Sequence, residues 1–337
     1  MARKADFLRH PTVPISVGRK SVSELARQMA RTGFQGRTLG QAVDVWEQMF
    51  RRKGMTIFLG LTGAMVPAGM RRVIAFLIER KLVDCIVSTG ANLFHDAYEA
   101  LGRKHYQGTD TVDDAALQRY HIDRMYDVYA SEDEFRILDW KIAGFARSIS
   151  PCRISTREFM RRWGRELARM GGARDSIVVA AYRNHVPLFV PAICDSGYGI
   201  ALHLARRRGV DIDLDQLKDV EEIVELYGAS RETGGIYVGG GVPRNFIQQT
   251  SVIEDIVEQN APHQYGIQFT IDPPHYGGLS GSTFSEAVSW GKYHPRDAKM
   301  VQVFADATIA LPIVAHALEE RTRGLKRKRV RSPWPLD

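Results

Sequence analysis

The chain has 337 residues, of which 44% are hydrophobic and 25% are charged, so it has enough apolar material for a large globular core. Its longest uncharged stretch, residues 55–70, is too short and too rich in glycine and proline to cross a bilayer, which excludes a membrane protein. Its three cysteines are far apart, which excludes a disulfide framework and a cysteine-based zinc site. No apolar signal segment opens the chain, and we expect a cytoplasmic protein without a bound metal.

The net charge of +7 comes from one end of the chain. Seven lysines and arginines and no acidic residue fall between Arg321 and Arg331, and the rest of the chain is neutral. A basic arm can hold phosphates, but we expect a solvated C-terminal tail over residues 321–337 and no specific nucleic-acid partner.

Helical and strand-like segments alternate along the chain. Apolar residues at helical spacing predict a helix over residues 39–50, and a strand over 56–61 and a helix over 73–78 follow. A strand, a turn of small residues and a helix recur from residues 83, 187, 236 and 301. This alternation predicts an α/β fold, a doubly wound and mostly parallel sheet with helices on both faces, as in Rossmann-like proteins.

The domain organisation follows from the same pattern. Residues 103–135 are polar and acidic and interrupt the alternation, so we expect an excursion there. No stretch is rich enough in proline, glycine or serine to separate two domains. We therefore predict a helical extension over residues 1–54, one catalytic domain over 55–320 and the basic tail.

Four of the predicted strands are followed by turns of small residues with a polar anchor. Such turns let a ligand approach the backbone at the carboxyl ends of parallel strands, where helix N-termini favour a pyrophosphate. No turn has the GxGxxG pattern, and glycines needed only for tight turns are an equally good interpretation.

Residues 265–295 differ from the rest of the chain. They show little periodicity and concentrate polar and aromatic residues among glycines and serines, so we expect a long functional loop. Lys292 in this segment follows five uncharged residues, and a desolvated amine there is suited to imine chemistry, although most single lysines are solvated surface charges.

Four motifs together resemble the deoxyhypusine synthase family: EAVSWGK at residues 286–292, GGGVPRNFI from residue 239, DSGYG from 195 and VFADAT from 303. The resemblance runs from about residue 55 to about residue 318. It implies NAD as cofactor and a spermidine-derived aminobutyl group held as an imine on Lys292, then passed to an acceptor amine. It also implies a homotetramer with active sites between paired subunits.

Position by position, the resemblance places the NAD contacts in the turns after the strands. These residues are Gly63, Ala64, Met65, Val66, Pro67, Thr89, Gly90, Ala91, Asp195, Gly240, Ile271, Asp272, Asp306 and Ala307. Asp195 and Asp306 follow apolar runs, where carboxylates meet ribose hydroxyls. A helix N-cap is the alternative role, above all for Asp306.

The same comparison gives a substrate-binding set of His95, Asn245, Gly277, Gly278, Leu279, Glu286 and Trp290. Trp290 would form a wall of the polyamine channel, where an indole face can hold a cation; core packing is its alternative role. Eukaryotic members have charged or histidine groups where this chain has Phe94 and His95, Ile200, Asn245 and Leu279. Fewer carboxylates weaken the attraction for a polycation.

Three functions remain open on the sequence. The first is a transferase of the aminobutyl group of spermidine to the lysine of a hypusine-type translation factor. The second is the same chemistry with a small amine such as putrescine, as in homospermidine synthesis. The third is a catalytically silent NAD-binding protein, against which Lys292 and Trp290 argue.

Overall fold

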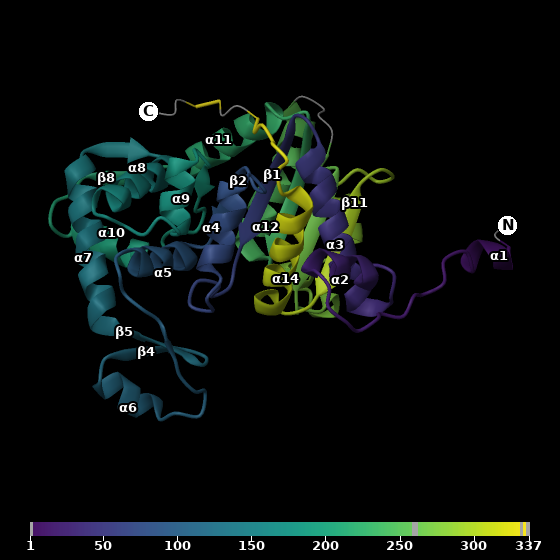
Figure 1. The fold of residues 1–337 in the computed structure, drawn as a ribbon. Coiled ribbons are helices and arrows are strands. Elements are labelled where there is room, and N and C mark those ends of the chain that lie inside the picture. The colour runs from purple at the N-terminus through teal and green to yellow at the C-terminus, as the bar shows by residue number, and fades with distance from the viewer. Residues whose placement is uncertain (1–2, 258–261, 331–332, 335–337) are drawn as a thin grey trace.

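The computed structural model describes residues 3–257, 262–330 and 333–334, and its centre is a six-stranded parallel sheet (Figure 1). The strand order is β11-β10-β9-β1-β2-β7. The strands are β1 (Met55–Leu61), β2 (Cys85–Ser88), β7 (Leu188–Phe189), β9 (Glu232–Val238), β10 (Tyr265–Thr270) and β11 (Lys299–Phe304). All neighbours pair in parallel, which confirms the predicted sheet.

Helices cover both faces of this sheet because successive strand residues point to opposite sides. Ile57 and Leu59 of β1 join the core formed with α3 (Phe34–Arg51), α4 (Arg71–Glu79) and α14 (Ala307–Thr322). Phe58 between them joins a second core with α11 (Gln216–Gly228) and α12 (Gly241–Val257). Both faces of β1 are therefore covered, and this strand reads as a nearly continuous hydrophobic run that is buried throughout.

A helical layer lies beyond the β7 edge of the sheet (Figure 1). It contains α5 (Gly90–Ala100), α7 (Glu132–Ile149), α8 (Thr156–Arg169), α9 (Ile177–Arg183) and α10 (Gly197–Arg206), with a small sheet of β6 (Cys152–Ile154) and β8 (Ile212–Leu214). α1 (Lys4–Phe7) and α2 (Val22–Met29) precede α3 at the other side. No helix in the described part of the chain is long and apolar enough to span a membrane.

The polar stretch around residues 103–135 forms a separate small unit that projects from this layer (Figure 1). It consists of β3 (Tyr106–Gln107), α6 (Asp114–Arg119), β4 (Ile122–Met125) and β5 (Val128–Ser131), and its strands pair antiparallel in the order β3-β5-β4. The expected excursion is thus an antiparallel addition to a parallel fold.

The expectation of a long irregular loop over residues 265–295 is wrong in part. Its first six residues are strand β10, and η1 (Pro274–Tyr276), η2 (Leu279–Gly281) and α13 (Phe284–Ser289) follow. All six β10 residues are buried, including the polar Gln268 and Thr270, so buried and exposed positions do not alternate along the strand. A Cβ on Gly266 would lie 2.7 Å from Phe284 Cε1 and 2.9 Å from Tyr293 Cε1, so this position has no room for a side chain.

The expectation of a solvated basic tail is wrong for Arg327 and Arg329, whereas Arg323 is exposed as expected and residues 331–332 and 335–337 lie outside the described residues. Arg327 is buried and forms a bidentate pair with Asp84 at 2.6 and 2.8 Å, and it also donates to the Met55 carbonyl at 2.6 Å. Arg329 lies 3.4 Å from Asp84. These partners are more than 240 residues away in sequence, so a local charge count could not reveal them.

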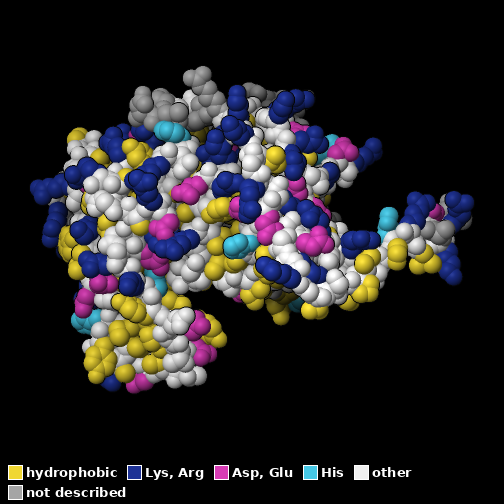
Figure 2. Space-filling model, viewed as in Figure 1, with side chains coloured by type: hydrophobic (Ala, Val, Ile, Leu, Met, Phe, Trp, Pro, Cys, Tyr) yellow, Lys and Arg dark blue, Asp and Glu magenta, His cyan; other side chains and the backbone are white. Residues whose placement is uncertain are grey.

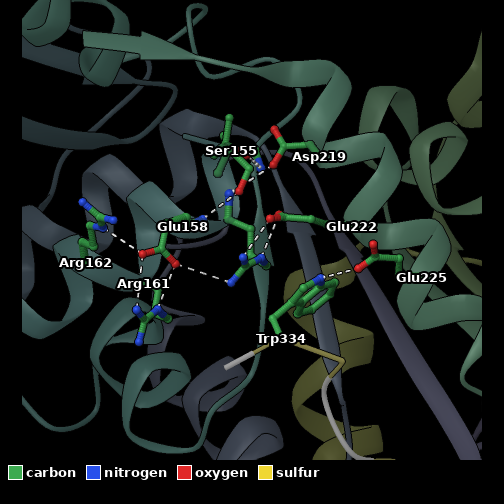
Figure 3. Close-up of polar contacts among 11 residues, drawn as sticks. Ser155, Glu158, Arg161, Arg162, Asp219, Glu222, Glu225 and Trp334 are labelled. Atoms are coloured by element: carbon green, nitrogen blue, oxygen red, sulfur yellow. Dashed lines mark hydrogen bonds and ion pairs between the residues drawn. The ribbon is translucent and has the colours of Figure 1, made fainter. Parts of the chain in front are cut away.

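Trp334 holds the tail against the helices at the same end of the molecule (Figure 3). Its indole Nε1 donates to Glu225 Oε2 at 2.7 Å, and the Arg157 guanidinium lies 4.5 Å from its ring centre. Arg157 itself is paired with Glu222 through two bonds of 2.8 Å. Arg327, Arg329 and Trp334 are therefore part of the folded structure.

Candidate functional site

The predicted cofactor residues follow the strands of the central sheet. Residues 63–67 follow β1, 89–91 follow β2, Gly240 follows β9, 271–272 follow β10, and 306–307 follow β11. Because the strands are parallel, their carboxyl ends meet at one edge and bring these turns together, as in other open α/β sheets. Asp195 is exposed in the turn between β7 and α10.

Hydrogen bonds connect neighbouring turns along this edge. The Gly240 N–H donates to Thr62 Oγ1 at 3.0 Å, and that hydroxyl donates to the Val238 carbonyl at 2.7 Å. Asn92 links the turns after β1 and β2: its Oδ1 accepts from the Met65 N–H at 3.1 Å, and its Nδ2 donates to Thr89 Oγ1 at 3.2 Å. Thr62 and Asn92 were not predicted, although both lie beside predicted residues.

Two positions in these turns require glycine for different structural reasons. Gly63 has φ +76°, which a side chain rarely allows, and little protein lies where its Cβ would be. Gly240 is approached by the chain instead, because a Cβ there would lie 2.5 Å from Ser280 Cα. The first glycine leaves backbone accessible to a ligand, and the second lets the 279–282 segment close over the turn.

Asp306 is exposed and is the N-cap of α14. Its Oδ1 accepts from the Thr308 N–H at 2.7 Å and from the Thr308 hydroxyl at 2.6 Å. The N-cap role considered for Asp306 is therefore present in the structure. Its hydrogen bonding to a ribose of NAD stays a prediction.

A cavity of about 320 Å³ lies beside the first turns of α12. It is lined by Asn245, Gln248, Leu279, Ser282, Glu286, Ala287, Trp290 and Lys292. The structure thus brings together the predicted catalytic lysine and four of the predicted substrate-binding residues. Trp290 is 66% exposed, so core packing is excluded as its role.

The side chain of Lys292 is held in this cavity by one neutral partner. Its Nζ donates to Asn245 Oδ1 at 2.9 Å and lies 5.6 Å from the centre of the Trp290 ring. Burial lowers the pKa of Lys292, and the positive charge of Arg244 lowers it further, against an opposing effect of Glu286. The amine is therefore easier to deprotonate than an ordinary lysine, which a nucleophile requires.

Arg244 is the functional residue that sequence reasoning missed. It is fully buried, and its Nη1 donates to Gln268 Oε1 at 2.9 Å and to the Ser282 carbonyl at 2.8 Å. Gln268 in turn donates to the Ser280 carbonyl at 2.9 Å. Arg244 therefore shapes the 279–282 wall and places a cation near the lysine. The available signal was a charged residue among buried neighbours in GGGVPRNFI.

The remaining predicted substrate residues do not line the cavity. Gly277 and Gly278 are in the loop just before Leu279. His95 lies on α5, where its Nδ1 is 2.9 Å from His105 Nε2, and His105 Nδ1 is 2.7 Å from Glu99 Oε1. Burial, together with His105, lowers the pKa of His95 to about 4, so this ring is neutral at physiological pH.

Chemically, the cavity offers a half-buried amine, one carboxylate, one exposed indole face and an amide oxygen. An unprotonated Nζ can add to an electrophilic carbon, Glu286 can pair with an ammonium group, and the indole can stack on a cation. The arrangement is suited to covalent chemistry on an amine-bearing substrate.

Known proteins resemble this chain over most of its length. The family model "Deoxyhypusine synthase" matches residues 24–318. The chain is 58% identical to "Probable deoxyhypusine synthase 2" of Methanosarcina acetivorans over 95% of the chain and 93% of that protein. It is 39% identical to "Probable deoxyhypusine synthase 1" of the same organism, over 91% and 93%.

A solved structure from Entamoeba histolytica that is assigned as a deoxyhypusine synthase has the same fold, with a TM-score of 0.63 at 17% identity, over 93% of this chain and 96% of that one. The extent of the family match and the identity to its members make the conclusion plain: this chain belongs to the deoxyhypusine synthase family.

Proposed function

We propose that this protein is an NAD-dependent transferase that moves an aminobutyl group from a polyamine, through an imine on Lys292, to an acceptor amine. The observation that supports this proposal most directly is the environment of Lys292. Its side chain is half-buried, its Nζ donates a hydrogen bond of 2.9 Å to the neutral Asn245 amide oxygen, and its pKa is lowered by burial. Family membership supports an enzyme of this kind.

The residues of the edge fit NAD. Glycine turns with accessible backbone suit a pyrophosphate, and exposed carboxylates at Asp195 and Asp306 suit sugar hydroxyls. When bound, NAD would accept a hydride from the carbon beside the polyamine's secondary amine and later return it. Ser280 of the cavity wall packs closely against Gly240 of the predicted NAD edge. The predicted cofactor site and the cavity around Lys292 are therefore adjacent, as hydride transfer and imine formation on one substrate require.

The chain's own groups would then carry the transfer. The Lys292 lone pair adds to the oxidised carbon, and 1,3-diaminopropane leaves as the lysine imine forms. Asn245 orients Nζ through its amide oxygen, Glu286 pairs with a substrate ammonium, and the Trp290 face holds a cationic segment. The acceptor amine next displaces Lys292, which is released unchanged.

A small amine such as putrescine is the acceptor that we favour over a protein lysine. Among the described residues that line the cavity, Glu286 is the single carboxylate, whereas Asn245 and Leu279 are uncharged. These uncharged residues stand where the eukaryotic members of the family that the sequence resembles have charged or histidine groups, and we therefore expect a different acceptor. The chain is more similar to "Probable deoxyhypusine synthase 2" of Methanosarcina acetivorans than to "Probable deoxyhypusine synthase 1" of the same organism.

We also propose a homotetramer. Large apolar side chains are exposed at the edge that carries the predicted NAD turns, including Ile271 at 69% and Ile309 at 65%. Such exposure is typical of surfaces covered by another subunit.

Borohydride trapping tests the covalent step. After incubation with NAD and spermidine, reduction should add an aminobutyl mass to the peptide that contains Lys292. Lys292→Arg should abolish the adduct, because guanidinium does not form this imine. Lys299→Arg, a nearby exposed lysine, is the matched control and should leave the adduct intact. An adduct that persists in Lys292→Arg would refute the assignment.

The acceptor is tested separately with labelled spermidine, NAD and either putrescine or the lysine-bearing translation factor. We expect a labelled triamine from putrescine and little labelled protein. Efficient labelling of the protein alone would overturn the small-amine choice but leave the lysine imine standing.

A further inference from the structure

An open groove of about 730 Å³ lies at the amino-terminal end of β1. One wall is the end of α3 and the turn into the strand, with Arg51, Arg52 and Lys53; the other is the tail from Leu325 to Lys328. The groove shares no lining residue with the cavity around Lys292. Figure 2 shows Lys and Arg side chains gathered along this end of the molecule.

The tail wall is held in place by the buried arginine in its middle. Arg327 is fixed by Asp84, the Met55 carbonyl and the Lys81 carbonyl, whereas its neighbours Lys326 and Lys328 are exposed. In an extended segment, alternate side chains point to opposite sides. Arg327 therefore holds Lys326 and Lys328 on the outer side of the tail. The tail wall of the groove is fixed by the contacts of Arg327 and does not depend on a freely moving segment.

The charges of the groove are only partly compensated. Arg51 is paired with Glu47 at 2.8 Å, and Arg52 lies 3.7 Å from Glu232. Among the residues that the structure describes, Lys53, Lys326 and Lys328 have no carboxylate within 4 Å. Three uncompensated cations in a concave surface focus a positive potential and attract a multiply charged anion.

We propose that this groove is a binding site for a polyphosphate group, either inorganic tripolyphosphate or the triphosphate of a nucleotide. Several closely spaced phosphates suit cations contributed from two walls, since lysine and arginine donate to phosphate oxygens from different directions. The groove has the size of a small-ligand site, and Phe50 and Leu325 add apolar surface to its lining. Its tail wall lies beyond residues 24–318, which the family model matches.

Calorimetric titration of the full chain tests this site with tripolyphosphate and, separately, with ATP. Lys326→Ala with Lys328→Ala should weaken tripolyphosphate about fivefold for each cation removed. The matched control, Arg206→Ala with Arg207→Ala, removes two exposed cations from α10 and should leave binding unchanged. Equal affinities for tripolyphosphate and ATP would identify the phosphates as the recognised group. A higher affinity for ATP would indicate an additional contact to its base or sugar. Both results support the site.

Saturating NAD separates this groove from the predicted cofactor edge, and it should not displace tripolyphosphate. Lys53→Ala provides a second route, because it alters the opposite wall and leaves the anchored tail intact. The proposal is overturned if neither probe binds, if NAD displaces tripolyphosphate, or if the groove variants and the α10 control weaken binding equally.

Discussion

At the scale of single residues, burial decides which ionisable groups are unusual. Lys292 and His95 are both shifted toward their neutral forms, and burial is the first cause for each. His95 stays neutral down to a pH of about 4, so a role as hydrogen-bond acceptor would persist across the physiological range. The pKa shift comes from packing, which no local sequence pattern records.

Asp139 is a buried carboxyl that the proposed reaction does not use. Its side chain is on α7, Oδ1 has no hydrogen-bond partner in the described part of the chain, and burial raises its pKa to about 6. The folded state therefore holds a proton that the unfolded state releases, so stability falls as pH rises from about 4 to about 6.

Asp139→Asn should remove this cost. We expect a gain of about 1–2 kcal/mol at pH 7 and almost none at pH 4, measured by urea unfolding at both pH values. Asp110→Asn, at an exposed position, is the control and should change neither value. A variant that loses stability at pH 7 would show that the carboxylate has a partner that stabilises it.

At the scale of elements, one residue serves a helix end and a predicted ligand contact. Asp306 ends the loop after β11 and caps α14. The geometry that brings a carboxylate to the carboxyl edge of the sheet also places it at a helix N-terminus, so the two roles are compatible.

Substitutions at Asp306 can separate the two roles. Asp306→Ala should lower stability by about 0.5–2 kcal/mol through the lost cap and weaken NAD about ten- to a hundredfold through the lost charged hydrogen bond. Asp306→Asn keeps a capping side chain, so it should restore stability but not NAD affinity. NAD titration and thermal unfolding check both, and unchanged NAD affinity in a folded Asp306→Ala protein would leave the cap as its sole role.

At the scale of the whole molecule, the tail closes the fold. Asp84 lies at the start of β2, and it accepts from the Ile57 N–H at 2.8 Å and from Arg327. The C-terminal segment is thus joined to two central strands of the sheet, β1 through the Met55 carbonyl and the start of β2 through Asp84.

Removing the Arg327 guanidinium should therefore destabilise the entire domain. Arg327→Ala leaves Asp84 buried with a weaker partner, and breaking such a pair costs about 3–5 kcal/mol. Lys326→Ala, at the exposed neighbouring position, should stay within about 0.5 kcal/mol of the unaltered protein. Denaturant unfolding measures both, and equal stability of the two variants would mean that the tail is not held as described.

The sequence by itself determined the alternation of strands and helices, the glycine turns at the strand ends, and the family through EAVSWGK. These are local signals, because periodicity, turn residues and a motif each lie within a short stretch of chain. It therefore also indicated Lys292 together with Asn245, Leu279, Glu286 and Trp290, which meet in the cavity.

Only the tertiary structure decided the order of the strands, the burial of β10, the role of Arg244 in the cavity wall and the pairing of Arg327 with Asp84. Each of these depends on contacts between segments far apart in the sequence. Burial and ion pairing are properties of such contacts: the same arginine is solvated in an isolated tail and buried beside a carboxylate in the folded chain.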